Sequence, residues 1–377
     1  MAQEEQNPRV NFSRRLRWDL EANSLAEAVA RFRAAGRPFL DLTVSNPTRV
    51  DLPYPEDWLD ALRDPRALAY DPDPRGLRLA REAVAAYYAS LGATVHPDRI
   101  ILTASTSEAY SFLFKLLADP GDEILTPTPS YPLFEFLAGL EHLTTIDYPW
   151  DTPDFDRWIS TRTRAAILVH PNNPTGRFWR RSQPLPESIP LIADEVFFDY
   201  ALHPPPNACP SFAARSESLT FTLSGLSKIC ALPQMKLGWI VVSGPEPDAR
   251  RAAEQLELIA DTYLSASTPI QLAAATRWLP ERHRIQAPLL ERLLYNSRHT
   301  DPVEAGWTGL TSVTTPQSPH DAVALLEACG VLVHPGAFFG LQRTPCAVIS
   351  LLTRPDIADE AAARLSRFRT ATSPPSY

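Results

Sequence analysis

The chain has 377 residues, of which 44% are hydrophobic and 21% are charged, so it can bury a large core and is not intrinsically disordered. Its formal net charge of −8 argues against a broad basic surface that binds nucleic acid. The sequence has no run of about 18 apolar residues, so it predicts no membrane span. Because the polar N-terminus does not resemble a secretory signal, we expect a cytoplasmic protein.

Apolar residues at helical spacing predict a first helix over about 14–35, and a proline-rich connector follows over 46–73. From residue 75, helical patterns alternate with short apolar runs. The predicted strands are 99–103, 123–127, 165–170, 190–195, 219–224 and 237–242, and the predicted helices are 77–90, 106–118, 131–141 and 249–260. Because these strands are apolar throughout, they predict an α/β fold with a mostly parallel sheet flanked by helices.

The last quarter of the chain has a different pattern. Helical patterns continue to about 299, and short strands at 331–333 and 346–351 then mix with helices at 320–329 and 356–369. This mixture predicts a smaller α+β domain. We expect a large domain over 50–285 and a small domain that combines 1–49 with 286–377.

Cysteine and lysine limit the possible chemistry. The four cysteines have no CxxC spacing, which disfavours a disulfide framework and a metal site. Only three of the 36 basic residues are lysines, namely Lys115, Lys228 and Lys236. Arginine is not a nucleophilic amine at neutral pH, so amine chemistry must use one of these three. Lys228 lies between two predicted buried strands, which disfavours a surface role.

Three polar segments follow predicted strands. In TASTSEAY (103–110) a helix begins directly after a strand, so Ser105, Thr106, Ser107 and free backbone N–H groups could bind a phosphate; an ordinary N-cap has the same pattern. HPNNPTG (170–176) is a rigid polar turn. In IADEV (192–196), Asp194 lies at the carboxyl end of an apolar strand, where open α/β sheets bind ligands; a solvent-facing acidic turn is the alternative.

Taken in order, these segments resemble the class I/II aminotransferases, which are pyridoxal-phosphate enzymes of fold type I. The resemblance runs from about residue 40 to the C-terminus. It is carried by YDPDPRGLRLAREA (70–83), ASTSEA (104–109), PGDEILTPTPSYP (120–132), HPNNPTG, DEV, SGLSK (224–228) and VLVHPGAFFG (331–340). The resemblance implies fold type I architecture, in which the large domain binds the cofactor.

The resemblance also implies roles for individual residues. Lys228 would form a Schiff base with pyridoxal 5'-phosphate and then act as the acid–base group. Asp194 would keep the ring nitrogen protonated, Asn173 would hydrogen-bond the phenolic oxygen, and Tyr131 would stack on the ring. The phosphate would be bound by Ser105, Thr106, Ser107, Ser227 and Lys236, and by Tyr70 from the neighbouring subunit of a homodimer.

The implied activity is transfer of an amino group between an amino acid and a 2-oxo acid. The alternatives are a carbon–sulfur lyase or a decarboxylase on the same scaffold, and a non-catalytic binding protein of fold type I. Three positions depart from the family: Phe197 replaces a tyrosine near the phenolic oxygen, Lys236 replaces an arginine on the phosphate, and Val348 stands where an arginine binds the substrate carboxylate. Arg343 and Arg354 are candidates for that last role.

Overall fold

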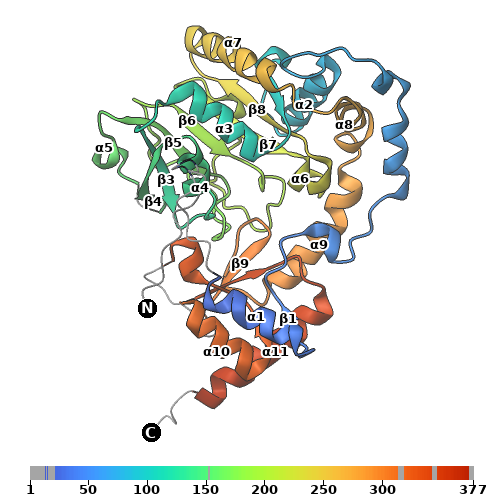
Figure 1. Cartoon of the computed structure of the whole chain (residues 1–377), viewed down its shortest axis with the longest axis vertical. Coiled ribbons are helices and arrows are strands. Elements are labelled where there is room, and N and C mark those ends of the chain that lie inside the picture. Colours follow the sequence, from blue (N-terminus) through green and yellow to red (C-terminus); the bar gives the residue numbers. More distant parts are fainter. Residues whose placement is uncertain are drawn as a thin grey trace, which may run out of the picture.

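The computed structural model describes residues 22–151, 153–312, 318–341 and 346–372, together with Ser13 and Arg15. Its largest element is a seven-stranded sheet (Figure 1). The strands are β2 (Ile100–Thr103), β3 (Glu123–Thr128), β4 (Thr144–Pro149), β5 (Thr163–Val169), β6 (Leu191–Asp194), β7 (Thr220–Gly225) and β8 (Gly238–Ser243).

The strands of this sheet lie in the order β2-β8-β7-β6-β5-β3-β4. Strand β8 pairs antiparallel with both of its neighbours, and the other pairings are parallel. The prediction of a mostly parallel sheet is therefore confirmed. Strand β4 was not predicted, because it is an edge strand in which only Tyr148 is buried, so its sequence lacks an apolar run.

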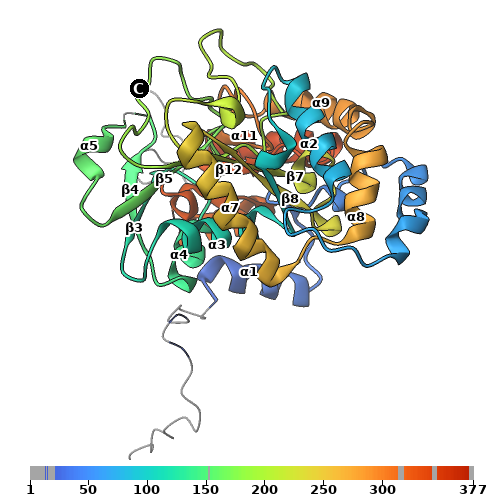
Figure 2. The same cartoon turned by 90° about the horizontal axis from the view of Figure 1, so that it is seen from above.

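Each central strand is buried on both faces, which explains its continuous apolar sequence. In β5, Ile167 packs in one core with α3 (Thr106–Leu117), α4 (Phe134–Leu140) and α7 (Glu246–Tyr263), whereas its neighbour Leu168 packs on the opposite face with Trp179. Figure 2 shows these three helices on the same side of the sheet. The other helices of this part of the chain are α2 (Arg78–Ser90), α5 (Phe155–Trp158), α6 (Leu226–Ile229), α8 (Thr268–Ala273) and α9 (His283–Ser297).

The C-terminal part forms a separate three-stranded antiparallel sheet, called here the C-terminal sheet. Its order is β11 (His334–Pro335), β12 (Ala347–Ser350) and β9 (Thr308–Thr311). Strand β1 (Leu40–Asp41) pairs in parallel with β10 (Val331–Leu332). The helices α1 (Ser24–Ala34), α10 (Pro319–Cys329) and α11 (Pro355–Thr372) lie beside these strands in Figure 1. The N-terminal segment thus packs with the C-terminal one.

The first helix begins later than predicted, and the predicted connector contains short helices. Residues 14 and 16–21 of the predicted helix 14–35 lie outside the described residues, and α1 begins at Ser24, where Asn23 caps it. The proline-rich connector contains the short 3-10 helices η2 (Pro47–Arg49), η3 (Glu56–Arg63) and η4 (Pro65–Leu68). In the described segments, no helix has both the length and the hydrophobicity to span a bilayer.

Candidate active site

A cavity of about 840 Å³ lies where the carboxyl ends of several strands of the large sheet meet the C-terminal sheet. This is the edge at which open α/β sheets bind ligands. The cavity brings together all of the predicted site residues except Tyr70: Ser105, Thr106, Ser107, Tyr131, Asn173, Asp194, Ser227, Lys228 and Lys236. Segments that are distant in sequence therefore converge on one site.

The start of α3 forms one wall of the cavity. Ser105 is the N-cap, and its hydroxyl accepts a hydrogen bond from the Glu108 backbone N–H at 3.2 Å. Thr106 and Ser107 begin the first turn, where backbone N–H groups have no acceptor within the helix. Gly238 of β8 lies against this turn: an added Cβ would be 2.9 Å from the Ser105 carbonyl carbon and 3.0 Å from the Thr106 nitrogen. The close packing therefore fixes the position of a potential anion site.

Asp194 is buried at the end of β6. The Tyr110 hydroxyl donates a hydrogen bond to its Oδ2 at 2.8 Å, and the Val196 backbone N–H donates to its Oδ1 at 3.2 Å. Burial raises the pKa of Asp194, while these two hydrogen bonds and the charge of Lys228 oppose the shift. The sequence reasoning missed Tyr110, although it lies within the quoted TASTSEAY segment, four residues after Thr106 on α3.

Lys228 lies on α6, directly after β7, and it is partly buried. Burial lowers the pKa of Lys228 to about 8, and the Asp194 carboxylate opposes that shift. The Lys228 Nζ atom is 4.8 Å from the centre of the Trp307 ring and 5.4 Å from that of Phe197. The Tyr200 hydroxyl donates to the Lys228 carbonyl oxygen at 2.6 Å. Trp307 was not anticipated, because no motif surrounds it in the sequence.

The remaining predicted residues differ in their surroundings. The Asn173 Oδ1 atom accepts a hydrogen bond from the Thr308 hydroxyl at 3.1 Å, which links the polar turn to the C-terminal sheet. Tyr131 is 48% exposed at the cavity. Lys236 has a left-handed backbone with φ of 53°. Tyr70 is 83% exposed and lies outside this cavity.

Of the two arginines considered for the substrate carboxylate, only Arg354 lies among the described residues, and its contacts do not support that role. Arg354 donates hydrogen bonds to Asp51 at 3.1 Å and to Asp356 at 2.9 Å, and it does not line the cavity. Arg343 lies outside the described residues. Val348 lines the cavity as an apolar residue. Lys115, the third lysine, is paired with Glu141 on a different part of the surface.

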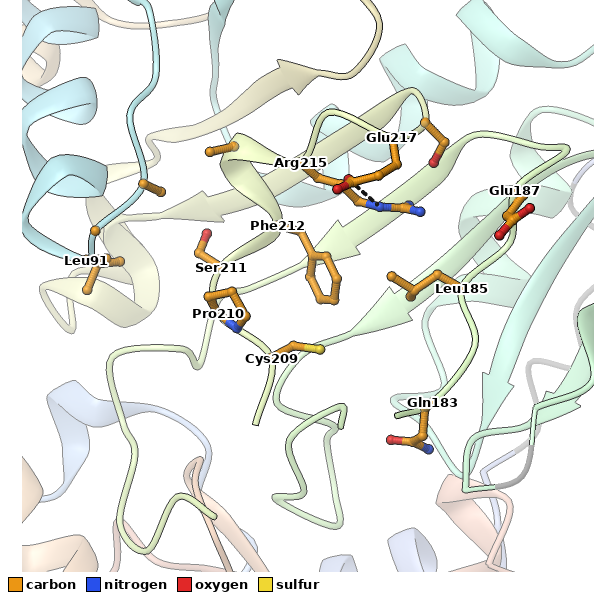
Figure 3. Close-up of a pocket in the computed structure, with 14 residues that line it drawn as sticks. Leu91, Gln183, Leu185, Glu187, Cys209, Pro210, Ser211, Phe212, Arg215 and Glu217 are labelled. Atoms are coloured by element: carbon orange, nitrogen blue, oxygen red, sulfur yellow. Dashed lines mark ion pairs between the residues drawn. The ribbon is translucent and has the colours of Figure 1, made fainter. Parts of the chain in front are cut away.

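A second cavity, of about 870 Å³, is shown in Figure 3, and it shares no lining residue with the first. It is formed by residues that include Gln183, Cys209, Ser211 and Phe212, from the segments that connect β5 to β6 and β6 to β7. The dashed line in Figure 3 marks the ion pair of Arg215 with Glu217, whose nearest atoms are 3.6 Å apart. None of the predicted site residues lines this cavity, so we place the candidate active site in the first one.

Comparisons with known proteins identify the family of the chain and its relatives. A family model described as "Aminotransferase class I and II" matches residues 37–293. The chain is 31% identical over 270 residues to a glutamate-pyruvate aminotransferase AlaA of Haemophilus influenzae, covering 65% of each chain. It is 30% identical over 277 residues to the Escherichia coli protein of the same name, covering 69% of this chain and 68% of the relative. The solved alanine aminotransferase of Pyrococcus furiosus shares the fold, with a TM-score of 0.77 at 23% identity over 92% of this chain and 96% of that one.

Proposed function

The chain belongs to the class I and II aminotransferases and has their fold type I architecture, and on this premise we propose that it moves an amino group from an amino acid to a 2-oxo acid with pyridoxal 5'-phosphate as cofactor. One observation carries the proposal. Asp194 is buried and Lys228 is partly buried in one cavity, yet neither forms an ion pair with any described residue. Charges removed from water need partners, so a ligand with complementary groups would stabilise both.

The donor set of the cavity fits this cofactor. Lys228 would hold its aldehyde carbon, and Asp194 would pair with its ring nitrogen. The first turn of α3 and the hydroxyls of Ser105, Thr106, Ser107 and Ser227, together with Lys236, would bind its phosphate. When bound, the cofactor supplies an electron-withdrawing ring that stabilises negative charge on the substrate carbon bearing the amino group.

The surroundings of Lys228 suit it to proton transfer. A pKa of about 8 leaves part of the amine neutral near neutral pH, so Nζ can take a proton from the substrate carbon and later return it. The flanking Phe197 and Trp307 rings are edge-on to each other, with centres 5.6 Å apart. They exclude water from one side of the amine and restrict its motion.

We include a homodimer in the proposal, with the active site completed by the partner subunit. Tyr70 is 83% exposed and Leu68 is 92% exposed, and both lie in or next to η4. Large apolar side chains so exposed on one short segment are typical of a contact surface. Tyr70 would reach the phosphate of the neighbouring subunit.

The division into a large domain over 50–285 and a small domain of 1–49 and 286–377 also remains a proposal.

No contact in the described cavity favours a lyase or a decarboxylase over amino transfer. The test is to load the purified protein with cofactor, supply amino donors with pyruvate or 2-oxoglutarate, and quantify the new amino acid. We include glutamate and pyruvate because two relatives are named for them. Amino transfer that is lost in Lys228→Ala and kept in the control Lys115→Ala supports the proposal. Release of thiol or carbon dioxide without amino transfer contradicts it.

A further inference from the structure

The wall of the active-site cavity that comes from residues beyond 300 is strongly apolar. This C-terminal wall includes Trp307, Phe338, Phe339 and Val348. Among the described lining residues of the whole cavity, the lysines Lys228 and Lys236 are the cations, and arginine is absent. A carboxylate placed on this wall therefore has no guanidinium to pair with among the described residues.

Among the described residues of the C-terminal wall, His334 is the ionisable one. It lies on β11 directly opposite Val348 of β12, so the two side chains share the face of the sheet that lines the cavity. The ring centres of Phe339 and Phe338 are 5.8 Å and 6.2 Å from that of His334. The imidazole therefore lies between aromatic rings and directly across from Val348 on the neighbouring strand.

The polar atoms of this wall differ in whether they already have partners. The Thr308 hydroxyl donates to Asn173 Oδ1 at 3.1 Å, and the Ser350 hydroxyl donates to the Val44 carbonyl at 2.6 Å. His334 Nδ1 is buried and has no hydrogen-bond partner among the described residues. The residue as a whole is only partly buried and lines the cavity, so its imidazole is accessible to a bound ligand.

The groups around His334 favour its charged form when an anion is bound. Burial lowers its pKa in the empty cavity, whereas the Asp41 carboxylate and the backbone of Thr43 oppose the shift. A bound carboxylate would also favour the imidazolium, and the resulting hydrogen bond would be charge-assisted.

We propose that His334 binds the carboxylate of the amino donor, and that the donor is a monocarboxylic amino acid with an apolar side chain. The inference rests on the proposed function, because that function places an amino acid in this cavity. One imidazole N–H gives a single hydrogen bond rather than a bidentate fork. The donor's orientation must therefore come from packing of its side chain on Phe338, Phe339 and Val348. A second carboxylate on this apolar wall would be desolvated without a cationic partner among the described residues, which disfavours glutamate and aspartate.

The first test compares His334→Phe, which removes the hydrogen bond, with His334→Gln, which keeps a donor. For leucine and phenylalanine as donors, we expect His334→Phe to raise KM about 10-fold or more, as for a lost hydrogen bond to a charged group, with a smaller change in kcat. We expect His334→Gln to keep part of the affinity. His320→Phe, at an exposed position on α10, is the matched control and should match the wild type.

A binding measurement separates this inference from the proposed function. Calorimetric titration of the cofactor-loaded protein with 3-phenylpropionate, a monocarboxylate without an amino group, reports the carboxylate site without turnover. We expect the Kd to rise in His334→Phe and to fall again when Val348→Arg is added, because register places residue 348 beside residue 334. An unchanged Kd and KM in both His334 variants, or a higher kcat/KM for glutamate than for leucine and phenylalanine, overturns the inference. If no amino donor supports amino transfer although 3-phenylpropionate still binds in a way that depends on His334, the result would instead count against the proposed function.

Discussion

At the scale of single residues, the chemistry depends on two ionisable groups and the side chains that surround them. Lys228 lies on α6 directly after β7, Asp194 ends β6, and both line one cavity. Burial shifts the pKa of each toward its neutral form, and each partly opposes the shift of the other. The fold therefore sets the protonation state of Lys228 and of Asp194. A change in a neighbouring hydrogen bond should be measurable as a change in their pKa values.

Tyr110→Phe tests the hydrogen bond to Asp194. The Tyr110 hydroxyl lowers the pKa of Asp194, so its loss should raise that pKa further and leave less carboxylate to pair with the cofactor ring. We expect kcat to fall about 10-fold, as for loss of about 1–2 kcal/mol of interaction with a charged group. Tyr148→Phe is the control, since it removes a comparable buried hydrogen bond, to the Ile167 carbonyl, outside the site. Equal losses of activity in both variants would show a purely structural effect.

Lys228→Met tests the cost of burying the ammonium. The pKa of Lys228 is about 8 in the folded chain and about 10.4 in an unfolded one, so the folded state disfavours the charged form. In cofactor-free protein below pH 8, the variant should be more stable than the wild type by on the order of 1–3 kcal/mol. The difference should shrink as pH rises from about 8 to 10.4, because the folded wild type then loses its proton. Denaturant melts at pH 7 and pH 9.5 measure it, and a variant that is less stable at pH 7 contradicts the account.

Sequence reasoning found the residues that lie in local motifs and missed those that act from other elements. Lys228 and Asp194 could be selected because each follows an apolar strand, and lysine is rare in this chain. No motif surrounds Trp307, and His334 was given no role although it lies in VLVHPGAFFG, because their proximity to the cavity results from the pairing of β9 and β11 with β12. Arg354 was a plausible candidate from its sequence position, but its ion pairs with Asp51 and Asp356 hold it elsewhere.

At the scale of elements, the site depends on how closely β8 approaches the turn between β2 and α3. The buried strands of the large sheet were predictable because both faces are apolar, whereas the polar edge strand β4 was not. The antiparallel direction of β8 could not be read from its sequence, since an apolar strand has the same pattern in either direction. Gly238 on β8 then determines how near the strand can lie to the helix start.

Gly238→Ala tests this close approach. The added Cβ would meet backbone atoms of Ser105 and Thr106 at 2.9–3.0 Å, so the helix start must move. We expect a loss of about 1–3 kcal/mol in stability, as for other overpacked sites, and a weaker affinity for the cofactor phosphate. Gly309→Ala is the control, because its Cβ would meet the Thr300 side chain at 2.5 Å, away from the phosphate site. If both variants lose cofactor affinity equally in titrations, the role of Gly238 is general packing.

At the scale of the whole molecule, the proposed homodimer predicts that each active site draws on two chains. We expect sedimentation to show a dimer. Tyr70→Ala should lose most activity, since its phosphate contact would be absent, while Lys228→Ala should be inactive. Refolding the two variants together should restore activity, because half of the mixed dimers' sites then contain both native residues. Activity that does not recover on mixing, although dimers form, contradicts a shared site.

The central claim is that the cofactor is bound covalently to one particular amine. The direct measurement is to load the protein with pyridoxal 5'-phosphate, reduce it with borohydride, and map the modified peptide by mass spectrometry. The account predicts a phosphopyridoxyl group on Lys228, the same label in Lys236→Ala, and none in Lys228→Ala. A label on Lys115 or Lys236 of the wild type, or no label at all, would contradict it.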